Sequence, residues 1–250
     1  MQVVEKRIPI FASILAFIGV WIGLSFAKAD VTVLPQPWHV WTAFQEEVRS
    51  GEMAIHVWAT LRRVLLAFFI SMCAGTVLGY WLGRSDRANA WANTWVVIFL
   101  NIPALVIIVL CYLWIGLNET AAITAVCINK TAMVLVMVRE GTQTLSKPLD
   151  EMARVFAISP WRRLRYVVLP QLAPYFFASA RNGLSVIWKI VLVVEFLGRS
   201  NGIGFQIHLY FQLFDTAIVM AYAFCFVAIM LVIEYAALKP LESIANTWRG

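Results

Sequence analysis

The sequence has 250 residues, of which 61% are hydrophobic and only 14% are charged. About a quarter of the residues of a soluble domain are charged, so this composition excludes a soluble globular protein and indicates an integral membrane protein. Since a chain within lipid must satisfy its backbone hydrogen bonds internally, helices are the expected spanning elements. The formal net charge of +6 comes from basic residues between the apolar stretches, which indicates membrane topology rather than nucleic-acid binding.

Six stretches are long and apolar enough to cross a bilayer, because a spanning helix needs about 20 apolar residues. Between the first two stretches, residues 38–48 have apolar side chains at helical spacing, and we expect this helix to lie flat on the outer face. The sequence therefore predicts an all-α membrane protein whose single transmembrane domain covers residues 1–250. The six expected spans are 8–27, 64–82, 92–114, 120–138, 175–196 and 216–238.

The basic residues outside these spans gather mainly on one side of the predicted membrane. Lys6 and Arg7 precede the first span, whereas Arg62 and Arg63 are expected on the opposite side, just before the second span. By the positive-inside rule, both termini are then cytoplasmic. Within the third span, Pro103 must kink the helix because its ring removes a backbone hydrogen bond.

The loop between the fourth and fifth spans, residues 139–173, is the most informative part of the chain. Asp150 and Glu151 provide an acidic first turn for one short helix, and Ser159 followed by Pro160 is a typical start for a second. We expect these two helices to meet at Ala157. The loop also carries a regular pattern, Glu-Met-Ala, three residues, Ala, nine residues, Val, one residue and Leu-Pro.

This pattern resembles the EAA loop of the permease subunits of bacterial ABC importers, which reads Glu-Ala-Ala, three residues, Gly, nine residues, Ile, one residue and Leu-Pro. Met152 and Ala157 depart from the motif, and the spacing is intact. In the family the loop forms a coupling helix that docks into a groove of the ATPase subunit. The alternative is a basic amphipathic loop lying on anionic lipid. The residues that the resemblance assigns to ATPase coupling are Glu151, Ala153, Arg154, Ala157, Arg162, Arg163, Leu169 and Pro170.

Other segments resemble the nitrate, sulfonate and taurine branch of these permeases. Leu34-Pro35-Gln36-Pro37 precedes the amphipathic helix, and Arg181, Trp188 and Glu195 match residues of that branch. The resemblance covers roughly residues 34–245 and implies the fold of an ABC type I importer permease in the bacterial inner (plasma) membrane. It also implies a homodimer, although a heterodimer stays open, with two ATP-binding subunits on the cytoplasmic face and a periplasmic substrate-binding protein. ATP and Mg would then bind the partner ATPase, and no cofactor would bind this chain.

Lys130 and Lys189 lie within apolar spans, where a charged side chain is costly and usually functional. One hypothesis is that they offer positive charge to an anionic substrate; the alternative is an interior ion pair of Lys189 with Glu195 or Glu234. The family has a proline break lining its path near Pro103, although an ordinary kink would look the same. The candidate residues of the substrate path are Lys130, Asn129, Pro103, Trp188, Lys189 and Glu195.

The sequence contains no phosphate-binding loop and no nucleophilic, acid–base or metal-ligand constellation, so we expect neither an enzyme nor a metal site. The resemblance predicts the transmembrane subunit of an ATP-driven importer for a small nitrate-, sulfonate- or taurine-like anion. Three alternatives stay open: a permease for a neutral vitamin or pyrimidine-type precursor, a stand-alone six-span secondary carrier, and a membrane scaffold without transport.

Overall fold

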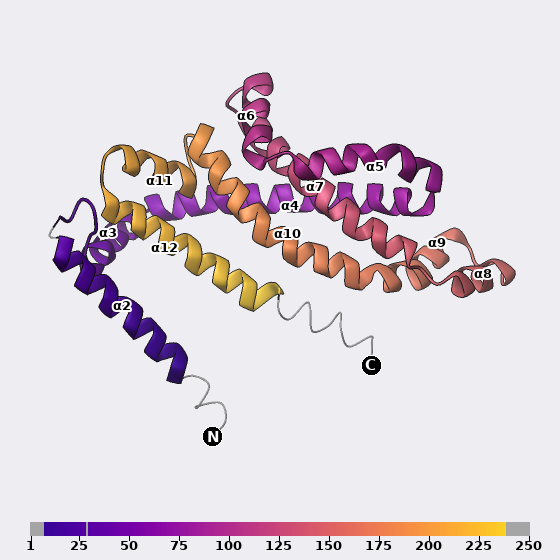
Figure 1. Cartoon of the computed structure of the whole chain (residues 1–250), viewed down its shortest axis with the longest axis horizontal. Helices are drawn as coiled ribbons and strands as arrows, with labels where there is room; N and C mark the ends of the chain where they lie inside the picture. Colours follow the sequence, from indigo (N-terminus) through magenta and orange to yellow (C-terminus); the bar gives the residue numbers. More distant parts are fainter. Residues whose placement is uncertain (1–7, 29, 239–250) are drawn as a thin grey trace.

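The computed structural model describes the backbone of residues 8–28 and 30–238, and the side chains of residues 12–28 and 30–236 (Figure 1). Every regular element in these ranges is a helix, which confirms the predicted all-α class. Lys6, Arg7, Lys239 and Arg249, expected on the cytoplasmic side, lie outside the described residues. The elements are α2 (Ile8–Lys28), α3 (Pro37–Ser50), α4 (Glu52–Arg84), α5 (Asp86–Asn101), α6 (Ala104–Ile115), α7 (Glu119–Gln143), α8 (Lys147–Val155), α9 (Pro160–Arg163), the π-helical turn η1 (Leu164–Val168), α10 (Leu169–Gly198), α11 (Ile203–Gln212), α12 (Thr216–Ile233) and the π-helical turn η2 (Glu234–Leu238).

Four helices of the described chain are long and apolar enough to cross a membrane: Glu52–Arg84, Glu119–Gln143, Pro160–Gly198 and Thr216–Ala236. The pair α5 and α6 adds a fifth if it counts as one broken span. The apolar stretch Ala12–Lys28 of α2 is shorter than these. The structure is thus a helical membrane protein with four or five candidate spans, and the count of six stays a prediction.

The long helices α4, α7 and α10 run along the longest axis of the molecule (Figure 1). The helices α8 and α9 lie at one end of this axis, and α3 and α11 lie toward the other. The main apolar core fills the space between α4, α7 and α10, with Ile187, Trp188 and Tyr222 fully buried in it. Polar groups at the two ends are therefore connected by continuous packed helices.

The second predicted span is part of a much longer helix, because α4 begins at Glu52 rather than at Val64. Arg62 and Arg63 therefore belong to the same helix as the span that they are predicted to precede. The apolar stretch of the sequence begins only after Arg63, because Arg63 is charged. The helix nevertheless includes Arg63, whose charge is neutralised by glutamates of other helices, as described below.

At Pro103 the chain breaks more sharply than the expected kink. Asn101 ends α5 and Ala104 begins α6, and the axes of the two helices differ by 96°. Ile102 and Pro103 have extended backbone conformations, with ψ of 124° and 135°. This agrees with the exclusion of helix from the residue before a proline and with the missing N–H of proline.

Close contact between α4 and α7 depends on glycines spaced four residues apart. Gly75, Gly79 and Gly83 lie on the face of α4 that meets α7. A Cβ atom at Gly79 would lie 2.6 Å from the backbone oxygen of Leu135 and 2.9 Å from Cβ of Val138. Such small residues allow two helices within a membrane to approach closely enough for backbone packing.

We predict that Gly79→Ala weakens the packing of α4 on α7 by about 1–3 kcal/mol, as overpacking does in a close-packed core. The melting temperature in detergent should fall by at least about 2 °C. Gly19→Ala is the matched control, because a Cβ atom at Gly19 in α2 would meet nothing within 4 Å. Equal melting temperatures for Gly79→Ala and Gly19→Ala would contradict the close approach.

Candidate functional site

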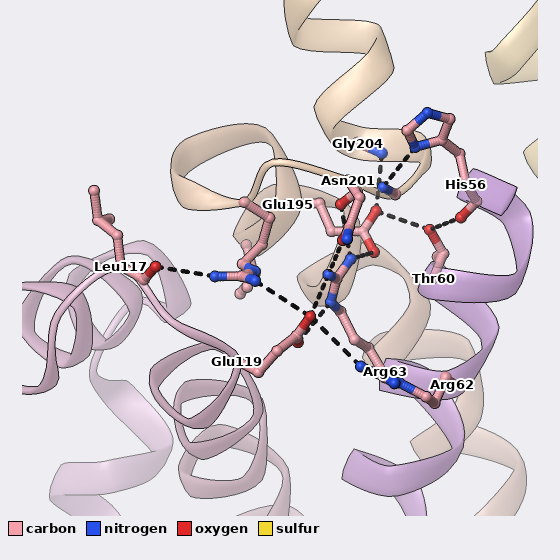
Figure 2. Close-up of polar contacts among 12 residues, drawn as sticks. His56, Thr60, Arg62, Arg63, Leu117, Glu119, Glu195, Asn201 and Gly204 are labelled. Carbon is pink, nitrogen blue, oxygen red and sulfur yellow. Dashed lines mark hydrogen bonds and ion pairs between the residues drawn. The ribbon is translucent and has the colours of Figure 1, made fainter. Parts of the chain in front are cut away.

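Two groups of polar residues stand out, one around Arg63 of α4 and one on the segment Lys147–Val168, which we call the α8–α9 segment. The first group is an ion-pair cluster made of the buried Arg63 and Glu195 and the half-buried Glu119, which we call the buried cluster (Figure 2). The second lies at the end of the molecule where α8 and α9 connect α7 to α10 (Figure 1).

Arg63 is only 2% exposed, and its guanidinium group contacts three other parts of the chain. Nη1 donates to Oε1 of Glu195 at 2.6 Å and to the backbone oxygen of Asn201 at 2.8 Å. Nε and Nη2 donate to the two carboxylate oxygens of Glu119 at 2.9 and 2.6 Å, and Nη2 also donates to the Asn201 side chain. A buried guanidinium with two carboxylates and no unused nitrogen is fully compensated for the loss of water.

Glu195 is completely buried near the end of α10. Besides Arg63, its carboxylate accepts hydrogen bonds from the hydroxyl of Thr60 and the backbone N–H of Gly204, both at 2.9 Å. A side chain at Gly202 or Gly204 would overlap Glu195, so the glycines allow the start of α11 to close over it. The positive end of the α11 dipole adds to the stabilisation of this carboxylate.

Additional hydrogen bonds connect the same helices around the cluster. His56 and Thr60 of α4 accept from the backbone N–H groups of Gly202 and Ile203 at 3.0 and 2.9 Å. Arg199, after the end of α10, donates to the backbone oxygen of Leu117 at 3.0 Å. The buried cluster therefore joins α4, α7, α10 and α11 into one rigid unit. Among the described residues, no three His, Cys, Asp or Glu side chains could hold a metal ion together.

In the α8–α9 segment, Ala157 makes the turn between the two short helices, as predicted. Its φ of 49° lies in the left-handed region, which costs a residue with a Cβ atom about 1–2 kcal/mol. Backbone hydrogen bonds from Ala157 to Arg154 (3.0 Å) and from Ile158 to Ala153 (2.9 Å) close the turn. The alanine thus takes up the conformation for which the motif normally uses glycine.

Asp150 holds this segment in shape. Its carboxylate accepts from Nε of Arg163 at 2.7 Å and also pairs with Arg84 at 3.6 Å and Arg154 at 3.4 Å. Desolvation raises the pKa of Asp150, but the Arg163 hydrogen bond and the charges of Arg84, Arg163 and Arg154 outweigh it and lower this pKa. The carboxylate is therefore ionised at neutral pH and fastens α8 to α9 and to the end of α4.

The residues assigned to ATPase coupling fall into two groups in the structure. Ala153 is buried and Arg163 is half-buried against Asp150, so both are occupied within the chain. The others are exposed: Glu151, Arg154, Ala157, Arg162, Leu169 and Pro170.

Sequence reasoning missed the apolar side chains of the same segment. Val155, Phe156 and Trp161 project outward, and Phe156 is 73% exposed. The available signal was several large apolar residues within a loop that is also rich in charge. Exposed apolar groups beside Glu151 and Arg154 are typical of a surface that binds another protein.

The candidates for the substrate path lie in different environments. Pro103 and Lys189 are exposed and Asn129 is half-buried, while Trp188 is buried and packs edge-on against Phe226. Lys130 is 1% exposed, and its Nζ lies 3.0 Å from the sulfur of Met133.

The expected ion-pair partners of Lys189 contact arginines instead. Glu195 pairs with Arg63, as described above, and Glu234 pairs with Arg181 at 3.6 Å. The structure thus brings Glu195 together with Arg63, which the sequence had placed outside the membrane.

Residues 75–237 match the model of a protein family described as "Binding-protein-dependent transport system inner membrane component". The chain is 28% identical over 202 residues to a putative aliphatic sulfonates transport permease protein of Bacillus subtilis, covering 81% of this chain and 72% of the relative. It is 24% identical over 195 residues to a taurine transport system permease protein of Escherichia coli, covering 78% and 70%. The fold is similar to a chain of the inward-facing MetNI methionine ABC transporter, with a TM-score of 0.67, 19% identity, and coverage of 79% of this chain and 98% of that one.

We predict that Glu195→Gln lowers the free energy of unfolding by about 3 kcal/mol, because it leaves the buried Arg63 charge partly uncompensated. Replacing both partners, in Arg63→Met/Glu195→Met, should restore part of this loss. Melting temperatures in detergent provide the comparison. The two side chains would not be coupled if the double variant lost as much stability as Arg63→Met and Glu195→Met lose together when each is made alone.

We predict that Asp150→Asn lowers the free energy of unfolding by about 1–2 kcal/mol at neutral pH, since a charge-assisted hydrogen bond is lost. Because folding lowers the pKa of Asp150, the native carboxylate contributes in full above the ordinary carboxyl pKa and less as the pH falls through its lowered value. The difference from wild type should thus be constant between about pH 5 and 8 and shrink below about pH 4. Glu140→Gln, at an exposed glutamate, is the control. A stability difference between Asp150→Asn and wild type that grows in acid would contradict the prediction.

Proposed function

Because the chain belongs to the family of binding-protein-dependent transport system inner membrane components, it is the permease component of an ABC importer and not an enzyme, and we propose that it forms the path for a small anionic solute. The observation that carries the ATP-driven part of this proposal is the exposed face of the α8–α9 segment, to which a separate ATPase can bind. Glu151 and the apolar Val155, Phe156 and Trp161 project from the bundle there and suit a partner protein.

In this proposal, two copies of the chain pair, and each α8–α9 segment contacts one of two ATP-binding subunits in the cytoplasm. ATP and Mg bind those subunits, and a periplasmic binding protein delivers the solute to the opposite face. The chain lies in the bacterial inner membrane with six spans, both termini in the cytoplasm and α3 on the outer side. Closure of the ATPase dimer would draw the two α8 helices together and rock the spans as rigid bodies.

The contacts described above assign separate tasks within the α8–α9 segment. Asp150, Ala153 and Arg163 preserve its internal shape, because their side chains are occupied within the chain. Glu151, Arg154 and Arg162 offer exposed charges to the ATPase, while Ala157, Leu169 and Pro170 shape the turn and the start of α10. The lipid-surface alternative needs the basic side chains but gives no role to Glu151.

The proposed solute is a small sulfonate-, taurine- or nitrate-like anion, which is supported by the names of the sulfonate and taurine permeases to which the chain is similar. Along the path, Pro103 and Lys189 are exposed and can meet the solute directly. Asn129 is half-buried, and Lys130, Trp188 and Glu195 are buried, so these four belong to the wall behind the lining residues.

We predict that Glu151→Arg abolishes retention of the ATP-binding subunit. The tagged chain is purified in detergent from native membranes, and the bound ATPase is measured by Mg-dependent ATP hydrolysis and mass spectrometry. We expect at least a tenfold loss, roughly what the reversal of one close charge pair at an interface produces.

Glu46→Arg is the matched control, since Glu46 is an exposed glutamate of α3, away from the α8–α9 end (Figure 1). It should retain the ATPase at the wild-type level. A stand-alone carrier predicts no bound ATPase in any sample, and a lipid-bound loop predicts the same result for both variants.

A further inference from the structure

The exposed faces of the long helices differ in chemistry. On α4 the exposed side chains within the apolar part are hydrophobic, including Leu65, Phe69 and Val77. On α10, by contrast, exposed apolar residues such as Val193 are accompanied by three polar ones: Asn182 and Lys189 are exposed, and Ser185 between them is half-buried. These three residues are separated by three and four positions, so they share one face of the helix. We call them the α10 polar stripe.

Lipid is a poor environment for this stripe, because a charged side chain at membrane depth is costly and normally faces water or protein. From Lys189 to Gly198, α10 continues for nearly 14 Å at about 1.5 Å per residue, farther than a lysine side chain reaches. The carboxylates first expected to pair with Lys189 contact Arg63 and Arg181 instead. Neither of these two carboxylates of the described chain neutralises Lys189, so its ammonium group requires water or protein around it rather than lipid.

We propose that the α10 polar stripe lines a water-filled path between two copies of the chain, and that the two Lys189 side chains, one from each copy, select an anionic solute. This inference rests on the proposed function, and it identifies the charge that sets the substrate class. The site is incomplete in one copy, because a single ammonium has lipid or water on its other side. Two ammonium groups facing one path attract oxyanions and repel cations, and their N–H groups form charge-assisted hydrogen bonds with the solute.

Lys130 does not share this task, although it carries the same charge. Its side chain is buried, and its Cε atom would lie only 3.0 Å from a Cβ atom placed at Gly183 of α10. Gly183 and Lys189 are six residues apart, which places them roughly 120° apart around the helix. Lys130 thus packs against a different side of α10 from the polar stripe.

The test measures the charge preference at Ser185 in the assembled transporter. Ser185→Cys is treated with two membrane-impermeant methanethiosulfonate reagents, one carrying a sulfonate and one a trimethylammonium group, and each rate is divided by that with free cysteine. Native Cys73, exposed on α4 next to Phe69 and Val77, serves as the lipid-facing reference and should not react. We expect the sulfonate reagent to react roughly tenfold faster, the lower end of the effect of a focused field.

Two second-site variants assign the preference to a residue. Adding Lys189→Met should bring the ratio of the two rates close to one, and adding Lys189→Arg should keep it. No reaction at Ser185→Cys would place the stripe in lipid or in a dry contact, and equal rates with Lys189 intact would remove its selecting role. Either result overturns the inference.

Failure of this inference is distinguishable from failure of the proposed function. If the charge preference is absent but the ATPase is retained and is lost in Glu151→Arg, the chain is still the importer permease and Lys189 does not select its solute. If the preference is present but no ATPase binds any sample, the stripe lines an anion path and the ATP-driven function is wrong.

Discussion

The structure depends on the compensation of one carboxylate. Glu195 is completely buried near one end of a helix that is long and apolar enough to cross a membrane, where an unpaired charge would cost several kcal/mol. Arg63, Thr60 and Gly204 together satisfy it, and Arg63 in turn requires Glu119. These partners come from α4, α7 and α11, so the charge is compensated only when α4, α7, α10 and α11 are assembled. The cluster therefore contributes to the specificity of the fold as well as to its stability.

Rigid connection between the two ends follows from this assembly. Both α7 and α10 reach from the cluster to the α8–α9 segment, and from Glu195 to Leu169 α10 alone extends about 39 Å at 1.5 Å per residue. At the far end, Asp150 fastens α8 to Arg163 and to Arg84 of α4. A force on α8 would therefore act on α4, α7 and α10 together rather than bend one loop. This coupling between the short α8–α9 segment and packed helices is what the proposed contact with a separate ATPase requires.

Local patterns in the sequence predicted the helical class, the break at Pro103 and the turn at Ala157, because each depends on neighbouring residues. The glycines at 75, 79 and 83 were also readable, since four-residue spacing of small residues indicates close helix packing. The partners of Arg63 could not be predicted from the sequence, because Glu119 and Glu195 lie 56 and 132 positions away along the chain. For the same reason hydropathy did not predict that the helix of the second span begins at Glu52, because a charge neutralised by distant carboxylates still counts as a charge in a local window.

The two membrane lysines show how burial divides residues that composition treats alike. Lys130 packs against Gly183 in the interior, whereas Lys189 emerges beside Asn182 and Ser185 on the outer face of the same helix. In the proposed dimer, the ion pairs of Glu195 therefore hold α10 to its own copy, while Lys189 gives α10 a charged face toward the second copy. Because the buried cluster holds α10 to its own α4 and α7, rocking of one rigid copy against the other would change the separation of the two Lys189 ammonium groups without breaking the cluster. Binding of an anion between them would then depend on the conformation of the whole transporter, as alternating access requires.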